Sequence, residues 1–311
     1  MQSKLNKIAK DTDFFLKGFI KKQKKSELIV PMKYGLFSGG KKVRSKILID
    51  AGSIFKIDYK TLIMIGSAIE CIHAYSLIHD DLPCMDNDTI RRGKQSTHIK
   101  FGESTAVLAG NSLLTMAFEI LTHKDLKTSQ AVKVDLVNKL SESAGHLGIA
   151  GGQYLDLSYE HEKVSKKRVL EMEIKKTGKL FSFCCAVPLI LKKRNKSEIK
   201  KFENLGSDIG LLFQVADDLI DHKGSLLTAG KKTTPIPPGI FRPVPDAPTE
   251  VPDAPTERQY PQQGAAVWVF FSVYCTTLYT PPYTPGARSA PGVYAVSYTH
   301  LRAHETKANL V

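Results

Sequence analysis

The 311-residue sequence has few of the features that would assign it to several common classes of protein. Its five cysteines include no CxxC pair and are too sparse for a disulfide scaffold. There is no GxxxxGK[ST] loop and no GxGxxG fingerprint, which argues against a nucleotide-binding cradle. The first residues lack the uninterrupted apolar stretch of a signal peptide. The apolar run 180–191 is interrupted by Ser182 and Pro188 and is shorter than the roughly 20 residues of a membrane span. We therefore expect a reduced, cytoplasmic chain without stable membrane insertion.

Proline is scarce in most of the chain and abundant at its end. Three prolines precede residue 235, and the other thirteen lie from Pro235 onward. The end of the chain contains VPDAPTE twice, at 244–250 and 251–257, which is typical of extended, polyproline-like chain. The sequence thus predicts a folded domain over residues 1–234 and an irregular, Pro-rich tail over 235–311. The tail is either foreign to the domain or a disordered or partner-binding extension of it.

The formal net charge of +13 lies entirely in the first 234 residues, because the five basic and five acidic residues of the tail cancel. A basic protein is attracted to nucleic acid, to a membrane surface or to a phosphorylated small molecule. Charge alone does not choose among these three kinds of partner.

Apolar residues recur in residues 1–234 at three- and four-residue spacing, and strand-like alternation is scarce, so we predict a nearly all-α domain. The segment 62–81 is apolar almost all round, as expected for a helix buried inside a large bundle. Pro83 disfavours the helical conformation for the residue before it, so this helix is expected to end close to Asp81.

Four aspartates follow this helix within nine positions: Asp80, Asp81, Asp86 and Asp88. The C-terminus of a helix already carries partial negative charge, which makes it an unfavourable place for carboxylates. The crowding therefore indicates a functional site rather than a solvated turn.

A second acidic cluster lies in FQVADDLID, residues 213–221. Asp217 and Asp221 are four residues apart, so they lie on one helix face and repel each other, and Asp218 is adjacent. Gln214 precedes Asp217 by three residues on the same face. In the first helix, His73 precedes Asp80 by seven residues and lies nearly in line with it.

Two carboxylate clusters without cysteine ligands or a histidine pair favour a hard, oxygen-binding cation, above all Mg²⁺. Magnesium commonly completes its coordination with water and substrate phosphate. The basic residues near the clusters suit such a substrate, since arginine binds phosphate in a bidentate manner and lysine acts as a point charge. These residues are Lys41, Lys42 and Arg44 in SGGKKVR, and Arg91 and Arg92 after the first cluster.

The order of these motifs resembles that of the trans-isoprenyl diphosphate synthases, and in particular of the bacterial farnesyl diphosphate synthases. A DDxxxxD motif at 80–86 followed by RRG, with a later DDxxD motif at 217–221, is the signature pair of that family. The likeness extends over roughly residues 1–233, through GGKKVR, ECIHAYSLIHDDLPCMDNDTIRRG, STHIKFGE, LAGNSLL, GGQYLDL, KKTGKL and FQVADDLID.

This resemblance implies an isoprenoid-synthase-type helical bundle with a central active-site cavity, usually a homodimer, that joins isopentenyl diphosphate to an allylic diphosphate. It implies Mg²⁺ as cofactor, held by Asp80, Asp81, Asp86, Asp217, Asp218 and Asp221. The residues that match allylic-substrate ligands are Arg91, Lys176, Thr177 and Gln214. Those that match isopentenyl diphosphate ligands are Lys41, Arg44, His73 and Arg92.

Product length is implied by Tyr75, five residues before Asp80. In similar enzymes the growing chain enters a hydrophobic tunnel below the first aspartate motif, and a bulky side chain at this position closes the tunnel. We therefore expect farnesyl diphosphate (C15), with geranylgeranyl diphosphate (C20) as the alternative.

The sequence departs from the family after about residue 234, where relatives continue with several more helices. We expect the closing helices to be missing, which would leave apolar surface exposed. A truncated homologue that binds diphosphates without turnover therefore remains an alternative. A nucleic-acid binder is disfavoured, because no binding motif is present and the paired acids would repel phosphate in the absence of metal.

Overall fold

The computed structural model describes residues 2–160, 162 and 164–223, without the side chains of residues 2 and 218–223. Within these ranges the regular secondary structure is helical apart from one short antiparallel hairpin, which confirms the predicted all-α fold. The Pro-rich tail lies outside the described residues, so our expectations about it remain predictions.

The elements are α1 Gln2–Lys21, α2 Ile29–Leu36, α3 Val43–Ile54, α4 Tyr59–Asp80, β1 Ile90–Arg91, β2 Lys94–Gln95, α5 Thr97–Phe101, α6 Glu103–Thr122, α7 Gln130–Ala144, α8 Ile149–Tyr159, α9 Lys166–Glu173, the π-helix η1 Ile174–Gly178, α10 Lys179–Leu191 and α11 Lys196–Lys223.

Two helices, α4 and α10, are buried along most of their length. Helix α4 packs against α1, α2, α3 and α6, and α10 packs against α3, α7 and α11. Both helices are apolar around most of their circumference, and every residue from Leu180 to Ile190 of α10 is buried. Burial of such all-round apolar helices is the main stabilisation of the bundle, because it removes the largest apolar surfaces from water.

Local signals set both ends of α4. Its N-terminus is capped by Asp58, whose side chain accepts a hydrogen bond from the backbone N–H of Thr61 at 3.0 Å. The helix ends at Asp80, and Asp81 is the C-cap residue, as predicted from Pro83. The first acidic cluster therefore begins where the buried helix stops.

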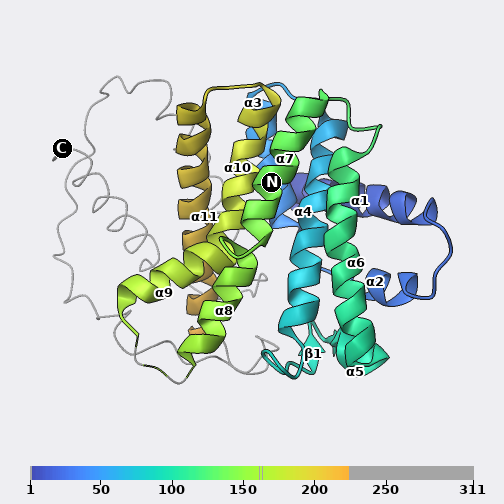
Figure 1. Ribbon diagram of the computed structural model, residues 1–311, viewed down its shortest axis with the longest axis vertical. Coiled ribbons are helices and arrows are strands. Elements are labelled where there is room, and N and C mark those ends of the chain that lie inside the picture. The colour runs from blue at the N-terminus through green and yellow to red at the C-terminus, as the bar shows by residue number, and fades with distance from the viewer. Residues whose placement is uncertain (1, 161, 163, 224–311) are drawn as a thin grey trace, which may run out of the picture. The chain divides into compact units, whose positions relative to one another are not determined.

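A tight hairpin follows the acidic cluster and is formed by β1 and β2. Its two turn residues, Arg92 and Gly93, have φ values of 52° and 73°. Positive φ at both central residues is the requirement of a type I′ turn, the connection that matches the twist of two-residue hairpins. The turn places Arg91 on a strand and Arg92 at the tip. In Figure 1 the hairpin lies at the same end of the bundle as the C-terminus of α4.

Among the described residues, α4 and α6 are long and apolar enough by composition to cross a membrane. Interrupted apolar runs had led us to expect no such segment. In the most apolar window of α4, 78% of the residues are buried inside the protein, against 44% for α6. A core helix passes the same test of length and hydropathy, so neither helix is good support for membrane insertion.

A buried ion pair joins α3 to α4. Glu70 of α4 is 3% exposed, and its Oε1 accepts hydrogen bonds from the backbone N–H and the hydroxyl of Ser45, at 3.2 and 2.9 Å. Its Oε2 lies 3.8 Å from Nζ of the buried Lys42, which is also 3.6 Å from Asp13 Oδ1 of α1. One carboxylate thus fixes the start of α3 and balances a buried ammonium group.

We expect Glu70→Ala to lower the free energy of unfolding by about 3 kcal/mol, because it leaves Lys42 buried with only Asp13 as counter-charge. Urea unfolding of the purified chain measures the loss. Glu70→Gln keeps an acceptor for Ser45 and should lose less. The matched control, Glu27→Ala at an exposed glutamate, should change stability by no more than about 0.5 kcal/mol. Equal stability of Glu70→Ala and the control would contradict this role of Glu70.

Candidate active site

The loop after α4 turns back so that Asp86 returns to the end of the helix. The backbone N–H of Asp86 donates to the carbonyl of Asp80 at 2.9 Å, and that of Asn87 donates to the carbonyl of Leu82 at 3.0 Å. Asn87 adopts a left-handed φ of 51°, which lets the chain leave the turn. The first and last acids of the predicted DDxxxxD motif are therefore brought together by backbone hydrogen bonds.

The Asp80 carboxylate lies in a position that is unfavourable for an anion. Burial raises its pKa to about 7, with Asp86 and Asp81 adding to the rise and Lys176 and Arg91 opposing it. No hydrogen bond or ion pair to its carboxylate is found within the described part of the chain. An anion in this position needs a positive partner that the protein itself only partly supplies.

Asp81 is arranged differently from its neighbour Asp80. It is 3% exposed, and its Oδ1 accepts hydrogen bonds from Nε of Arg91, at 2.8 Å, and from Nη2 of the same guanidinium group. Arg91 also contacts Asp88 at 3.0 Å. Burial alone would lower the pKa of Arg91, but the hydrogen bond and charge of Asp81 outweigh it. In this arrangement Asp81 orients Arg91, and its role as a metal ligand remains a prediction.

Lys176 and Thr177 lie in the π-helix η1, a rare conformation that is frequent at functional sites. Lys176 pairs with Asp156 of α8. Burial alone would lower the pKa of Lys176, but Asp156 and Asp80 outweigh it and raise the pKa. The hydroxyl of Thr177 donates to Gln214 Oε1 of α11 at 3.2 Å. Three of the four predicted allylic-substrate residues thus lie where η1 meets α8 and α11.

The second acidic cluster is carried by the C-terminal part of α11. Asp217 follows Gln214 by about one helical turn and is exposed. The side chains of Asp218 and Asp221 lie outside the described residues, so their contribution to a metal site remains a prediction. Since Gln214 contacts η1, the backbone of α11 is positioned to bring Asp217 toward the same end of the bundle as Lys176.

A second group of cations forms around His73. Arg44 Nη1 lies 3.3 Å from His73 Nε2, and its guanidinium carbon lies 4.9 Å from the centre of the Phe181 ring. The pKa of His73 is well below its ordinary value because of burial and the positive charge of Arg44 and Arg92. His73 is therefore neutral at physiological pH and accepts a hydrogen bond from Arg44.

The glycine pair Gly39–Gly40 allows Arg92 to join this group. Both glycines have left-handed φ values, of 105° and 108°, and a Cβ atom at Gly40 would lie 2.6 Å from Arg92 Nη1. Arg92 donates to the carbonyl of Gly39. Lys41 lies on the same loop and is exposed, which leaves its ammonium group accessible to a ligand.

Tyr75 lies in α4 below the acidic cluster. It is 8% exposed, and its hydroxyl donates to the carbonyl of Ala144 at the end of α7, at 3.2 Å. Its ring makes an edge contact with His79, with 5.7 Å between ring centres. Burial, followed by the charge of Asp80, raises the pKa of Tyr75 to about 12. The ring is therefore fixed between α4 and α7 in a buried position close to Asp80.

The donor chemistry of this site suits Mg²⁺, although no group of three or more metal-ligating side chains is found among the described residues. Magnesium needs only one or two protein carboxylates when substrate phosphates and water supply the remaining ligands. Asp80 and Asp86 offer two such carboxylates, and burial raises the pKa of Asp80 in spite of the nearby Lys176 and Arg91, so a further positive charge would stabilise its ionised form.

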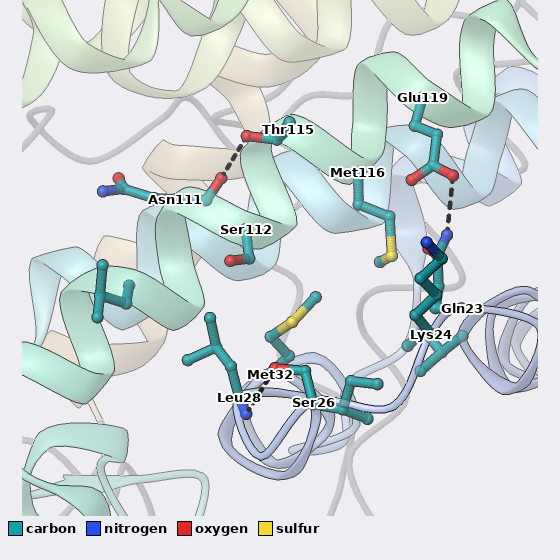
Figure 2. A pocket seen from close by; sticks show the side chains of 13 residues that line it. Gln23, Lys24, Ser26, Leu28, Met32, Asn111, Ser112, Thr115, Met116 and Glu119 are labelled. Atoms are coloured by element: carbon teal, nitrogen blue, oxygen red, sulfur yellow. Dashed lines mark hydrogen bonds between the residues drawn. The ribbon is translucent and has the colours of Figure 1, made fainter.

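A cavity of about 390 Å³ lies elsewhere in the protein, between α6 and the α1–α2 region (Figure 2). Leu28, Met32 and Met116 contribute apolar surface, and Gln23 donates to Glu119 Oε1 at 2.8 Å on its polar side. None of the predicted site residues lines this cavity. The central active-site cavity implied by the resemblance remains a prediction.

Three residues of the site were missed by the sequence analysis: Glu70, Gln153 and Asp156. Burial lowers the pKa values of Arg44 and Arg92, and the negative charge of Glu70 partly offsets this effect. Gln153 Nε2 donates to Asp86 Oδ1 at 3.1 Å. Gln153 and Asp156 are three residues apart in GGQYLDL, so they lie on one face of α8. This spacing was the only signal in the sequence that pointed to them.

Comparison with known proteins agrees with this geometry. The chain is 43% identical over 213 residues to a farnesyl diphosphate synthase of Buchnera aphidicola, covering 67% of this chain and 75% of that protein. An FPP/GFPP synthase of Zymomonas mobilis superposes with a TM-score of 0.66 at 36% identity, covering 73% of this chain and 85% of that one. A Helicobacter pylori geranyltransferase, solved with magnesium and isoprenyl diphosphate, has a TM-score of 0.64 at 32% identity, covering 74% and 79%.

The fold and these similarities define the chain as a trans-prenyltransferase with an isoprenoid-synthase bundle. The Polyprenyl synthetase family model matches residues 25–236, and the chain belongs to that family.

In metal-free protein, ionisation of Asp80 should destabilise the fold. Because its pKa is about 7 in the folded state and about 3.9 when unfolded, the folded state binds the proton more tightly, and stability falls as pH rises from about 4 to 7. Since Asp80 is only partly covered, we expect Asp80→Asn to be more stable than the wild type by about 1–2 kcal/mol at pH 8. Urea unfolding in EDTA across this pH range measures the difference.

The difference should shrink toward pH 4, where both proteins are uncharged at this position. The control, Asp135→Asn at an exposed site, should follow the wild type at every pH. An Asp80→Asn protein that is no more stable than the wild type at pH 8 would exclude the unfavourable position assigned to this carboxylate.

Proposed function

We propose that this chain condenses isopentenyl diphosphate with an allylic diphosphate, dimethylallyl or geranyl, in a Mg²⁺-dependent reaction that yields farnesyl diphosphate. The observation that carries the proposal is the position of Lys176 and Arg91 beside the paired carboxylates Asp80 and Asp86. Anionic and cationic groups next to each other suit a metal–diphosphate complex, in which both the metal and the phosphate oxygens need partners. The Helicobacter pylori relative, solved with magnesium and isoprenyl diphosphate, supports this assignment.

The allylic diphosphate would be bound by Arg91, Lys176, Thr177 and Gln214. Asp81 orients Arg91, and Asp156 holds Lys176, so both cations are positioned before substrate arrives. Asp80, Asp81 and Asp86, with Asp217, Asp218 and Asp221, would hold Mg²⁺. When bound, the metal acts as a Lewis acid and stabilises the negative charge of the diphosphate leaving group.

Isopentenyl diphosphate would be bound by Lys41, Arg44, His73 and Arg92. A neutral His73 offers a hydrogen-bonding ring without adding charge, while two arginines supply bidentate phosphate contacts. The negative charge of Glu70 stabilises the charged forms of Arg44 and Arg92, which would otherwise repel each other. The two diphosphates would thus bind to separate sets of cations, which keeps their carbon chains in a fixed relative orientation.

The reaction we propose has three steps. The allylic C–O bond breaks, and its electron pair leaves with the diphosphate. The double bond of isopentenyl diphosphate then attacks the allylic cation and forms the new C–C bond. The resulting cation loses a proton to the departed diphosphate, which restores a double bond. No protein nucleophile is required, and the chain contributes preorganised charge and proximity.

Three further parts of this assignment come from the sequence: the homodimer is implied by the resemblance, the location by the cysteine content and the lack of a signal peptide, and the domain boundaries by the distribution of proline. We propose a homodimer, with which the exposed Val107 and Leu108 of α6 are compatible, and a cytoplasmic location. We also propose residues 1–234 as the synthase domain and 235–311 as a separate tail. Two other functions remain as outcomes of the tests below: a C20 synthase, and a homologue that binds diphosphates without turnover.

The first test is turnover by the purified 311-residue chain supplied with isopentenyl diphosphate, geranyl diphosphate and Mg²⁺. We expect a C15 product, and its complete loss in EDTA, because the leaving group cannot depart while its charge is unbalanced. Chromatography that resolves products by chain length makes the measurement. A C20 main product would support the alternative synthase. Diphosphate binding without any product would support the non-catalytic homologue and contradict our proposal.

The second test concerns product length. Tyr75→Ala removes the buried ring below Asp80, so longer products than the wild type are expected from the same substrates. Tyr75→Phe keeps the ring and loses only the hydrogen bond to Ala144, and it should leave the distribution unchanged. If Tyr75→Ala gives the wild-type distribution, the side chain does not set product length.

A further inference from the structure

Helix α8 connects the anionic and cationic halves of the candidate site. Its Gly152 packs so closely against η1 that a Cβ atom there would lie 2.2 Å from the backbone nitrogen of Lys176. The next residue, Gln153, contacts Asp86, and Asp156 pairs with Lys176 one turn later. The close backbone approach at Gly152 fixes the distance between α8 and η1, so small shifts of α8 are resisted by packing.

We propose that Gln153 is a positioning residue for Asp86, and that its side-chain amide sets how strongly the chain binds Mg²⁺ together with diphosphate. This inference rests on the function proposed above. Gln153 is 7% exposed, and its Nε2 donates to Oδ1 of Asp86 at 3.1 Å. The backbone N–H of Asp86 is already bonded to Asp80. The hydrogen bond from Gln153 therefore fixes the remaining freedom of Asp86, which is the rotation of its carboxylate.

The orientation of the Gln153 amide follows from the hydrogen-bonding capacity of a carboxylate. An ionised carboxylate only accepts hydrogen bonds, so Gln153 must present its NH₂ group to Asp86. A hydrogen bond to Oδ1 of Asp86 orients the carboxylate and leaves its other oxygen available to a metal. Groups that contact a metal ligand commonly orient it in this way.

The carbonyl oxygen of Gln153 provides a second, independent observation. It is buried and has no hydrogen-bond partner among the described residues. A buried acceptor without a partner is unfavourable, and a purely structural position would be filled better by an apolar side chain of similar size. The unpaired oxygen indicates that a donor reaches this place in the working enzyme, such as a water molecule bound to the metal or to the substrate.

Gln153→Met tests the proposal, because methionine keeps the length and approximate volume of glutamine and removes the amide. The matched control is Gln23→Met, which removes another glutamine–carboxylate hydrogen bond, that with Glu119 at the outer cavity (Figure 2). Calorimetric titration of Mg²⁺ into full-length protein with inorganic diphosphate measures binding without turnover. Steady-state rates at varied Mg²⁺ and varied isopentenyl diphosphate measure the catalytic effect. Gln153→Ala serves as a second variant if Gln153→Met does not fold.

We expect Gln153→Met to weaken Mg²⁺ binding by about 10- to 100-fold, the range found for groups that orient metal ligands. The KM for isopentenyl diphosphate should stay within about twofold of the wild type, because that substrate is bound by other residues. Gln23→Met should match the wild type in both measurements.

Three results would overturn the proposal. Wild-type Mg²⁺ binding in Gln153→Met would show that the amide does not position Asp86, while the proposed function would stand if the wild type turns over. An equal loss of Mg²⁺ binding and of affinity for isopentenyl diphosphate would indicate a general structural role. If the wild-type chain neither binds Mg²⁺ with diphosphate nor gives product, the proposed function fails and this inference fails with it.

Discussion

The crowding of carboxylates at the C-terminus of α4 is the constraint on which the rest of the site depends. Helix α4 is buried along most of its length, so its end is held in place by the core and cannot move away from the charge it carries. The partial negative charge of the helix terminus adds to the repulsion between Asp80, Asp81 and Asp86. Burial, and after it the charges of Asp86 and Asp81, raise the pKa of Asp80, so Lys176 and Arg91 relieve only part of the cost of placing an anion here. A cation with a bound diphosphate would relieve the rest.

The neighbouring elements place opposite charges beside the charged residues of the site. Arg91 neutralises Asp81 from a hairpin whose turn requires two positive φ values. Lys176 is placed beside Asp80 by a π-helix, and is itself held by Asp156. On the other side, Glu70 balances cations that would otherwise repel one another. Each of these charges is thus balanced by an opposite charge from a neighbouring element, which lowers the cost of bringing them together.

Much of this arrangement could be predicted from the sequence. Apolar periodicity gave the helical fold, Pro83 gave the end of α4, and the motifs gave the residues that meet around Asp80 and His73. The sequence could not distinguish Asp80 from Asp81, because two adjacent aspartates look alike until the hairpin carries Arg91 to one of them. Glu70, Gln153 and Asp156 were missed for a similar reason. Their roles depend on contacts across 25, 67 and 20 residues, and only packing of the helices creates such contacts.

The central claim is that Mg²⁺ and diphosphate need each other at this site, since neither alone balances both the carboxylates and the cations. Thermal unfolding of the full-length chain with Mg²⁺ alone, inorganic diphosphate alone, and both together tests this claim most directly. The account predicts small shifts in Tm with either ligand and a shift with both that clearly exceeds their sum. A shift with both ligands that equals the sum of the separate shifts would contradict it.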